Sequence, residues 1–345
     1  MKYKQLINSL TADNVISSFN FAKNCNLIFS EIISNEQFHK SNQNDIFILQ
    51  EDTKEIFYKN NILKLSENKT IFCNYYLIED LFNILREVIE FKNIKIVVMQ
   101  SDHSIGSRLA SKIPDCVSGI YAVNILVNHP KLFPIPIGLA NYYSQKNLSF
   151  SEFKNINNFL EPKKIKKLYI NFEENTNFFH RYPLLKKLEK LDFVYIEKKK
   201  LTLEEYSKKL SLYKYIFCPY GNGVDTHRIW ETLYSGSTPV VFNHKTFETL
   251  KNLPVIFLDN FSNLSLKFLE KENEKIKNSE FQKLLLDYWI KYIEGHNFQN
   301  ESIEIELDTR KFNIEILKNY NKKKKKENLK KQYSTYLRKI YKKFF

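Results

Sequence analysis

The sequence has no apolar stretch approaching the roughly 20 residues that a membrane-spanning helix requires. Its first residues, Met1-Lys2-Tyr3-Lys4-Gln5, lack the apolar region and small-residue cleavage site of a secretory signal peptide. A hydrophobic fraction of 43% in 345 residues is typical of a globular protein long enough for two domains with their own cores. We therefore expect a cytoplasmic protein that does not cross the membrane.

Cysteine is scarce, and metal-binding spacings are lacking. The four residues, Cys25, Cys73, Cys116 and Cys218, are scattered without the spacing of a metal site. Cys73 and Cys116 lie in apolar contexts and are interpreted as reduced core residues. We interpret Cys218 as a small packing residue rather than a nucleophile, because no base is obviously paired with it. The chain also has no convincing Asp-x-Asp motif, so no metal site is predicted.

Acidic residues are nearly absent from the C-terminal tail, which makes the basic charge of the protein local. Residues 318–345 hold twelve Lys and Arg and one Glu, so they carry +11 of the net charge of +14 and leave +3 for the rest. A folded body close to neutral argues against a nucleic-acid groove running across it. We predict no nucleic-acid partner.

The tail combines this charge with helical periodicity. The charged run is Lys322, Lys323, Lys324, Lys325 and Lys326, and the apolar residues that follow at helical spacing include Tyr336, Leu337, Ile340 and Phe344. Basic amphipathic helices lie in membrane interfaces and prefer anionic lipid, each basic residue contributing about 1 kcal/mol near the surface. We predict peripheral association with the inner face of the membrane. The alternative is a helix that packs on its own protein or on a second subunit, and the oligomeric state is left open.

Apolar runs of strand length alternate with helical patterns over most of the chain, which indicates parallel sheets. The predicted strands are 45–49, 70–73, 94–99, 119–123, 167–171, 193–196, 215–217 and 239–242, and the predicted helices include 76–91, 182–191 and 202–212. Residues 261–318 are predicted to be mostly helical. A polar stretch divides the pattern, so we place the first domain at 1–145, a linker at 146–165, the second domain at 166–317 and the tail at 318–345.

Glycine is rare, and it is concentrated in one place. Three of the seven glycines and two of the nine prolines lie within residues 217–241, which we call the signature segment. There an apolar run ends in a loop with Gly221 and Gly223, and a helix follows. Such loops at the carboxyl ends of strands hold ligands in open α/β sheets. Arg228 and Glu231 share one helix face, suited to a phosphate and to ribose hydroxyls respectively. The same residues also fit a simple turn and a surface ion pair.

The signature segment resembles the C-terminal signature of exostosin-like glycosyltransferases. The matching residues are Cys218, Pro219, Gly221, Arg228, Glu231, Gly236, Pro239 and Val240. Upstream, residues 129–139 and 168–172 look like segments of related bacterial transferases, and the resemblance covers roughly residues 45–265. It implies the GT-B architecture, in which two Rossmann-like domains with parallel sheets face a cleft, the second domain binds the donor, and no metal holds the diphosphate. A late helix of such proteins packs back on the first domain.

The resemblance and the loop position together nominate donor-binding residues. They are Arg228, Glu231, Gly221, Gly223, Asn171, Arg181, Asp225 and His227. Arg228 is expected to hold the diphosphate and Glu231 the ribose. Arg181 and Asn171 are further candidates that would otherwise order loops. Asp225 is equally suited to capping the signature helix, and a loop histidine such as His227 is more often structural.

A general base is expected in the first domain. Asp102 and His103 follow the predicted strand 94–99, so they lie at a carboxyl end facing the interdomain cleft. Inverting transfer needs a base opposite the leaving group, and we assign Asp102 to this role with His103 as second choice. The alternative is that Asp102 caps the following helix.

The strand and helix pattern predicts an α/β protein with a C-terminal basic amphipathic helix, and the resemblance implies that its fold is GT-B. The predicted activity is inverting, metal-independent transfer from a nucleoside-diphosphate sugar, expected to be a UDP-sugar, to a surface glycan or lipid-linked oligosaccharide. A retaining transferase and a non-catalytic membrane-associated scaffold of the same fold are the alternatives.

Overall fold

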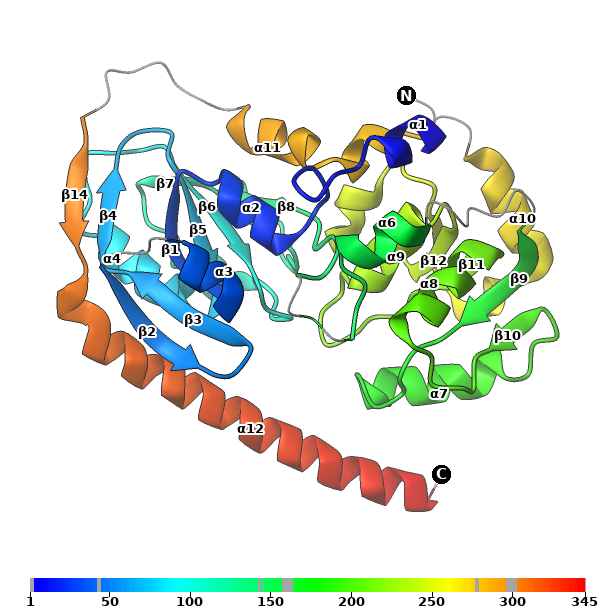
Figure 1. Cartoon of the computed structure of the whole chain (residues 1–345). Coiled ribbons are helices and arrows are strands. Elements are labelled where there is room, and N and C mark those ends of the chain that lie inside the picture. Colours follow the sequence, from blue (N-terminus) through cyan, green and yellow to red (C-terminus); the bar gives the residue numbers. More distant parts are fainter. Residues whose placement is uncertain are drawn as a thin grey trace.

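Two α/β units, each built on its own sheet, make up the computed structural model, which describes residues 3–41, 45–141, 144, 146–156, 164–276, 279–295 and 303–344 (Figure 1). The first sheet has the strand order β2-β3-β1-β5-β6-β7-β8, and the second has the order β10-β9-β11-β12-β13. Helices connect most of the successive parallel strands in both units, whereas β7 and β8 are joined by a loop. These features confirm the predicted α/β class and the GT-B-like arrangement of two sheets.

The first sheet is parallel from β1 to β8, and β3 pairs antiparallel with both β1 and β2. Its strands are β1 (Leu27–Ser34), β2 (Ile46–Glu51), β3 (Glu55–Asn60), β5 (Thr70–Asn74), β6 (Ile94–Met99), β7 (Val117–Ala122) and β8 (Leu132–Pro134). The accompanying helices are α2 (Ser18–Asn24), α3 (Asn35–Lys40), α4 (Ile78–Leu85) and α5 (Ser107–Ala110).

Strand β6 shows why the centre of this sheet forms. All six of its residues are buried, as expected of a parallel strand covered on both faces. Its only charged residue, Lys95, donates hydrogen bonds from Nζ to the carbonyls of Ile293 (2.8 Å) and Glu294 (3.2 Å). These carbonyls end α11 (Leu286–Glu294), where a cation is favourable. The buried lysine thus attaches a helix from late in the chain to the first sheet.

The second sheet is parallel throughout. Its strands are β9 (Ile165–Ile170), β10 (Val194–Ile196), β11 (Tyr213–Phe217), β12 (Thr238–Phe242) and β13 (Ile256–Leu258). Its helices are α6 (Phe150–Ile156), α7 (Phe178–Leu188), α8 (Leu203–Leu212), α9 (His227–Tyr234) and α10 (Leu266–Lys275). Helix α8 begins at a capping box, in which Thr202 and Glu205 each accept the other's backbone N–H.

The two units share apolar packing. One core cluster contains Val97 and Tyr121 of the first sheet together with Tyr169 and Trp230 of the second unit. Helix α1 (Tyr3–Asn8) lies beside the second unit, where the Tyr3 hydroxyl donates to the carbonyl of Tyr234 at 2.7 Å. The sequence-based boundaries at 145 and 165 remain predictions, and α6 falls inside the expected linker.

Residues 305–308 were expected to be helical, but they form a strand. This strand, β14 (Ile305–Asp308), pairs antiparallel with β4 (Ile62–Leu65) of the first unit. The side chain of Thr309 continues the contact, because its hydroxyl receives a hydrogen bond from the buried amine of Lys59 at 2.7 Å. Pairing between segments so far apart in sequence leaves no local periodicity from which it could be predicted.

The basic tail is the continuation of a longer helix, α12 (Asn313–Phe344), which begins before the expected start at 318. Ile316 and Tyr320 are buried in the first unit, so the helix is rooted in its core. Its far end reaches the second unit, where the ring of Tyr341 packs edge-on against Phe178 and Tyr182 of α7. Helix α12 therefore runs along one side of both units (Figure 1).

Candidate functional site

A cavity of about 530 Å³ opens between the two units at the carboxyl ends of the first sheet's strands, and we call it the cleft pocket. This is the edge at which parallel α/β sheets hold ligands. The lining includes residues from the end of β6, from the signature segment and from α12, namely Met99, Gln100, Ser101, Asp102, His103, Asn222, His227, Glu327, Lys330 and Lys331. The structure thus brings the predicted Asp102, His103 and His227 together.

The turn after β6 directs Asp102 toward the second unit. Gln100 adopts φ 62°, a left-handed conformation that is uncommon for a residue with a side chain. Its side-chain amide fixes this conformation by bonding to the backbone N–H (2.7 Å) and carbonyl (2.8 Å) of Ile32. Beyond the turn, Asp102 is exposed and accepts a hydrogen bond from Asn222 of the signature segment at 3.2 Å. Its other oxygen is available to a ligand hydroxyl.

His103 is tied to α12, a contact that the sequence did not indicate. Its Nε2 lies 2.5 Å from Oε1 of Glu327, and the Tyr76 hydroxyl donates to the same carboxylate at 2.7 Å. Burial raises the pKa of Glu327, but the hydrogen bonds from Tyr76 and His103 outweigh burial and lower it overall. His103 therefore has a carboxylate partner, whereas Asp102 faces the pocket.

Arg181 holds the loop of the signature segment in place through hydrogen bonds to backbone carbonyls. Its guanidinium donates to the carbonyls of Tyr220 (2.8 Å), Pro219 (3.2 Å) and Glu173 (3.2 Å). A Cβ on Gly221 would lie 3.5 Å from this guanidinium. The arrangement favours the loop-ordering role for Arg181, since carbonyls occupy all three of its nitrogens.

Gly223 lies at a close contact between the two units. A Cβ at this position would be 2.6 Å from Nδ2 of Asn124 and 3.2 Å from the carbonyl oxygen of Asp102. Asn124, just after β7, is held in place because its Oδ1 accepts the backbone N–H groups of Val224 (3.1 Å) and Asp225 (3.0 Å). The glycine therefore lets the signature loop dock on the loop that carries Asp102.

Asp225 is buried and acts within the protein. Its carboxylate accepts hydrogen bonds from the indole N–H of Trp230 (3.0 and 3.1 Å) and from the backbone of Ile137 (2.9 Å). Burial raises its pKa to about 7. These contacts fix the start of α9 and favour the structural alternative for Asp225. His227, the first residue of α9, lines the cleft pocket and donates from Nδ1 to the Gly138 carbonyl at 2.8 Å.

Arg228 and Glu231 share a face of α9, as their spacing predicts, and that face turns toward α8. Glu231 is 2% exposed, and its oxygens accept from the Leu148 backbone (2.9 Å) and the Tyr206 hydroxyl (2.8 Å). The Arg228 guanidinium lies over the Tyr206 ring at 5.1 Å, and its Nη1 is buried without a hydrogen-bond partner among the described residues. An unpaired guanidinium N–H suits an anion, whereas Glu231 has both oxygens occupied.

Asn171, the last of the nominated donor residues, and Cys218 both have partners or surroundings within the second unit. Asn171, just after β9, donates to the Tyr169 hydroxyl at 3.2 Å. Cys218 is fully buried, and burial raises the pKa of its thiol to about 12, so the thiol stays protonated. The functional roles of the nominated donor residues stay predictions.

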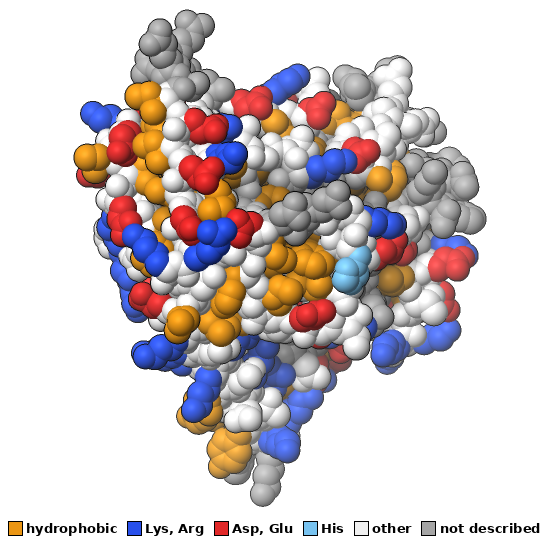
Figure 2. Space-filling view, turned by 60° about the vertical axis from the view of Figure 1, so that its left-hand side comes forward, with side chains coloured by type: hydrophobic (Ala, Val, Ile, Leu, Met, Phe, Trp, Pro, Cys, Tyr) orange, Lys and Arg blue, Asp and Glu red, His pale blue; other side chains and the backbone are white. Residues whose placement is uncertain are grey.

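The five lysines of the tail do not share one surface. Lys322, Lys323 and Lys326 line a second cavity against the first unit, and Lys324 lies over the rings of Tyr76 and Tyr320. Tyr336 and Ile340 are exposed, whereas Leu337 is half-buried, and the side chain of Phe344 lies outside the described residues. The basic and apolar side chains of this helix are visible on the segment that projects at the bottom of Figure 2.

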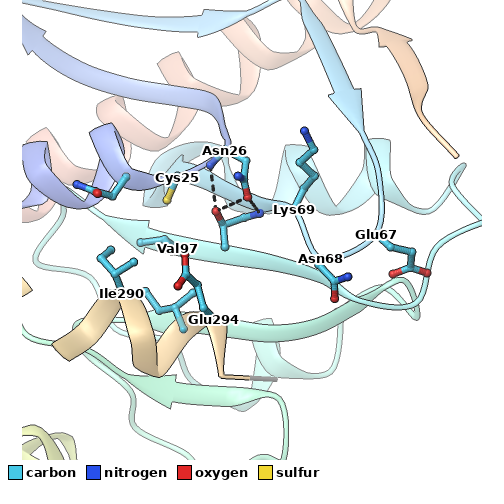
Figure 3. Close-up of a pocket in the computed structure, with 11 residues that line it drawn as sticks. Cys25, Asn26, Glu67, Asn68, Lys69, Val97, Ile290 and Glu294 are labelled. Atoms are coloured by element: carbon cyan, nitrogen blue, oxygen red, sulfur yellow. Dashed lines mark hydrogen bonds between the residues drawn. The ribbon is translucent and has the colours of Figure 1, made fainter. Parts of the chain in front are cut away.

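A smaller cavity of about 270 Å³ lies at the opposite edge of the first sheet (Figure 3). Asn26, Lys69 and Thr70, which precede or begin strands, form one side of it, and Ile290 and Glu294 of α11 form the other. Asn26 and Thr70 satisfy each other there through hydrogen bonds of 2.8 to 3.0 Å. Because this cavity lies at amino ends of strands and contains none of the nominated residues, we assign the site to the cleft pocket.

No family model matches the chain, and no curated protein sequence matches it. Among solved structures, one similar chain is described as the crystal structure of an alpha1,3-fucosyltransferase. The two are 12% identical, the similarity covers 74% of this chain and 78% of that chain, and the TM-score is 0.33. Similarity this low does not bear on activity. The resemblance to exostosin-like proteins rests on the sequence motifs alone.

Within the described ranges, helices are too short or too polar to pass through a bilayer. Across the same ranges, His, Cys, Asp and Glu side chains do not gather in groups of three or more that could hold a metal ion. Metal independence and location in the cell stay predictions.

Proposed function

We propose that the protein is a glycosyltransferase that moves a sugar from a nucleoside-diphosphate donor, a UDP-sugar, to a glycan acceptor. The observation that carries the proposal is the cleft pocket, in which the exposed carboxylate of Asp102, bonded through one oxygen to Asn222, faces the start of α9 across the two units. The carboxyl ends of parallel strands are where open α/β sheets hold ligands, and His227 brings the start of α9 from the second unit to this pocket.

The leaving diphosphate needs positive charge or N–H donors in place of a metal. Arg228 supports this role because its buried Nη1 has no partner among the described residues. The start of α9 supports it too, since the side chain of its N-cap residue, Thr226, makes no capping hydrogen bond. In our proposal the donor diphosphate lies at the start of α9 beside Arg228, and Asp102 removes the acceptor proton from the other side.

Nucleotide-sugar turnover tests the proposal. Wild-type protein is incubated with UDP-, GDP- and CDP-sugars, and ³¹P NMR follows the nucleoside diphosphate while ¹H NMR follows the anomeric proton. We expect one donor to be cleaved without added metal and the first product to carry the inverted anomeric configuration. A product that keeps the donor's configuration would instead establish a retaining transferase. Absence of cleavage for every donor would favour a non-catalytic scaffold.

We also propose that α12 attaches the protein to an anionic membrane surface. The support is an exposed stripe of Leu329, Tyr333, Tyr336 and Ile340, which are 57, 64, 61 and 37% exposed and have lysines between them. We expect binding to vesicles containing anionic phosphatidylglycerol, none to neutral phosphatidylcholine, and loss of most binding in Tyr333→Ser/Tyr336→Ser. Co-sedimentation measures this. A stripe that pairs two copies of the chain would instead appear as a dimer in sedimentation velocity that the same substitutions dissociate.

A further inference from the structure

A second cavity, of about 630 Å³, lies between α12 and the first unit, and we call it the basic cavity. It is contiguous with the cleft pocket, because Tyr76, His103, Glu327 and Lys330 line both. A ligand anchored in the basic cavity could therefore reach past His103 toward Asp102. None of the residues nominated for the donor lines this cavity.

The charges of the basic cavity are unbalanced. Its lining contains five cations, Lys322, Lys323, Lys326, Lys330 and Arg108, and three carboxylates, Glu79, Asp80 and Glu327.

Each of these carboxylates already has a partner. Asp80 lies 3.6 Å from the amine of Lys323, Glu79 lies 3.2 Å from that of Lys112, and Glu327 is bonded to His103. Within the described part of the chain, Lys322, Lys326, Lys330 and Arg108 make no ion pair. Four cations are thus left facing a space large enough for a ligand.

Three of these cations are evenly spaced along α12. Lys322, Lys326 and Lys330 follow one another at intervals of four residues, so they form a row about 12 Å long on one face of α12. Like charges at this interval destabilise a helix. Arg108, on α5, lies on the opposite wall of the cavity. A bound anion with more than one charge would relieve the repulsion within the row.

We infer that the basic cavity binds a phosphate or diphosphate group of the acceptor, and that the acceptor hydroxyl then reaches Asp102 in the cleft pocket. This inference rests on the proposed glycosyl transfer, whose acceptor it specifies. Several unpaired amines and a guanidinium suit an anion with multiple charges and acceptor oxygens. A single carboxylate would leave most of them unpaired.

Inorganic pyrophosphate is the probe for this site, and calorimetry measures its binding. Lys322→Ala/Lys326→Ala removes two cavity lysines, and Lys325→Ala/Lys339→Ala removes two exposed lysines of the same helix that line neither cavity. We expect the first pair to weaken pyrophosphate binding at least about tenfold, because charge-assisted hydrogen bonds are lost. The control pair should change it less than about twofold, since isolated surface charges contribute little.

A competition experiment separates the acceptor phosphate from the donor diphosphate. We expect pyrophosphate to bind equally well when the donor site is saturated with the nucleoside diphosphate that the turnover assay identifies. Loss of pyrophosphate binding under saturation would place the anion at the donor site and overturn the inference. Equal weakening in the two lysine pairs, or no binding by the wild type, would also overturn it.

The turnover assay on wild-type protein distinguishes this failure from failure of the proposed function. Donor cleavage without pyrophosphate binding would leave the transferase proposal standing and remove only the acceptor site. Pyrophosphate binding without cleavage of any donor would overturn the transferase and, with it, the identification of the anion as part of an acceptor.

Discussion

Asp102→Asn is expected to lower kcat for nucleotide-sugar turnover by about 10²- to 10⁴-fold, the usual contribution of a general base. The asparagine keeps the shape of the side chain and can still accept the hydrogen bond from Asn222, but it cannot take a proton. KM for the donor should change little, because the donor is held by the second unit in our proposal. Initial rates from ³¹P NMR provide the measurement.

The matched control is Asp115→Asn, which alters an exposed aspartate of the same unit that does not line the cleft pocket. It should retain wild-type kcat. Near-normal activity in Asp102→Asn would contradict the assignment of the base. Combined with a product of retained configuration, it would favour a retaining mechanism.

Gly223→Ala is expected to reduce turnover by about 10²-fold while the protein stays folded. The added methyl group would meet Nδ2 of Asn124 at 2.6 Å and the Asp102 carbonyl at 3.2 Å, so the signature loop and the Asp102 loop must move apart. Displacements near 1 Å in a reacting geometry cost about this much in rate. Asn124 cannot turn away freely, because it accepts two backbone N–H groups of the signature segment.

Gly106→Ala is the control for this substitution. A methyl group there would meet nothing within 4 Å, and the backbone of Gly106 is not in the left-handed region. Gly106 lines the basic cavity and not the cleft pocket, so donor turnover measured without an added acceptor should stay close to that of the wild type. Circular dichroism and the thermal midpoint establish that both variants are folded. Full activity in Gly223→Ala would show that the contact between the two loops does not position the reacting groups.

Buried, apolar strands were predictable from the sequence. The prediction of 94–99 coincides with β6, and those of 215–217 and 239–242 fall within β11 and β12, since these segments are continuous apolar runs. Helix α8 was predicted within one residue, and in the structure Thr202 and Glu205 form the capping box at its start. Helix α4 ends at Leu85, earlier than the predicted 91, so apolar spacing alone extended it too far.

Strand β1 was missed because polar residues interrupt its pattern. Ser30 and Glu31 are buried within it. Their polarity is satisfied by distant partners: the Ser30 hydroxyl accepts from the Asn74 backbone at 3.1 Å, and the Tyr58 hydroxyl donates to Glu31 at 2.5 Å. Burial also raises the pKa of Glu31 to about 7. Partners so far along the chain cannot be recognised in a single sequence.

The sequence predicted the first-unit side of the candidate site, which carries Asp102 and His103, better than the sides formed by α9 and α12. Position after a strand was enough to place Asp102 and His103 in the cleft pocket. Helical spacing placed Arg228 and Glu231 on one face of α9, but it could not show that α8 covers this face through Tyr206. The part of the pocket lining supplied by Glu327, Lys330 and Lys331 could not be predicted from the sequence, because it depends on how α12 crosses the first unit.

Stabilisation of the protein by a nucleotide that contacts Arg228 is the decisive test of the proposed donor site. Thermal unfolding is measured with UDP, GDP, CDP and their sugar conjugates, without metal, for the wild type, Arg228→Ala, Arg228→Lys and the exposed control Arg86→Ala. A ligand at 100 times its Kd stabilises the folded state by about 2.7 kcal/mol. We predict that one nucleotide raises the thermal midpoint of the wild type and of Arg86→Ala. Arg228→Lys should respond weakly, since it keeps the charge but not the planar fork, and Arg228→Ala should not respond. No rise with any nucleotide, or an undiminished rise in Arg228→Ala, would contradict the donor site proposed here.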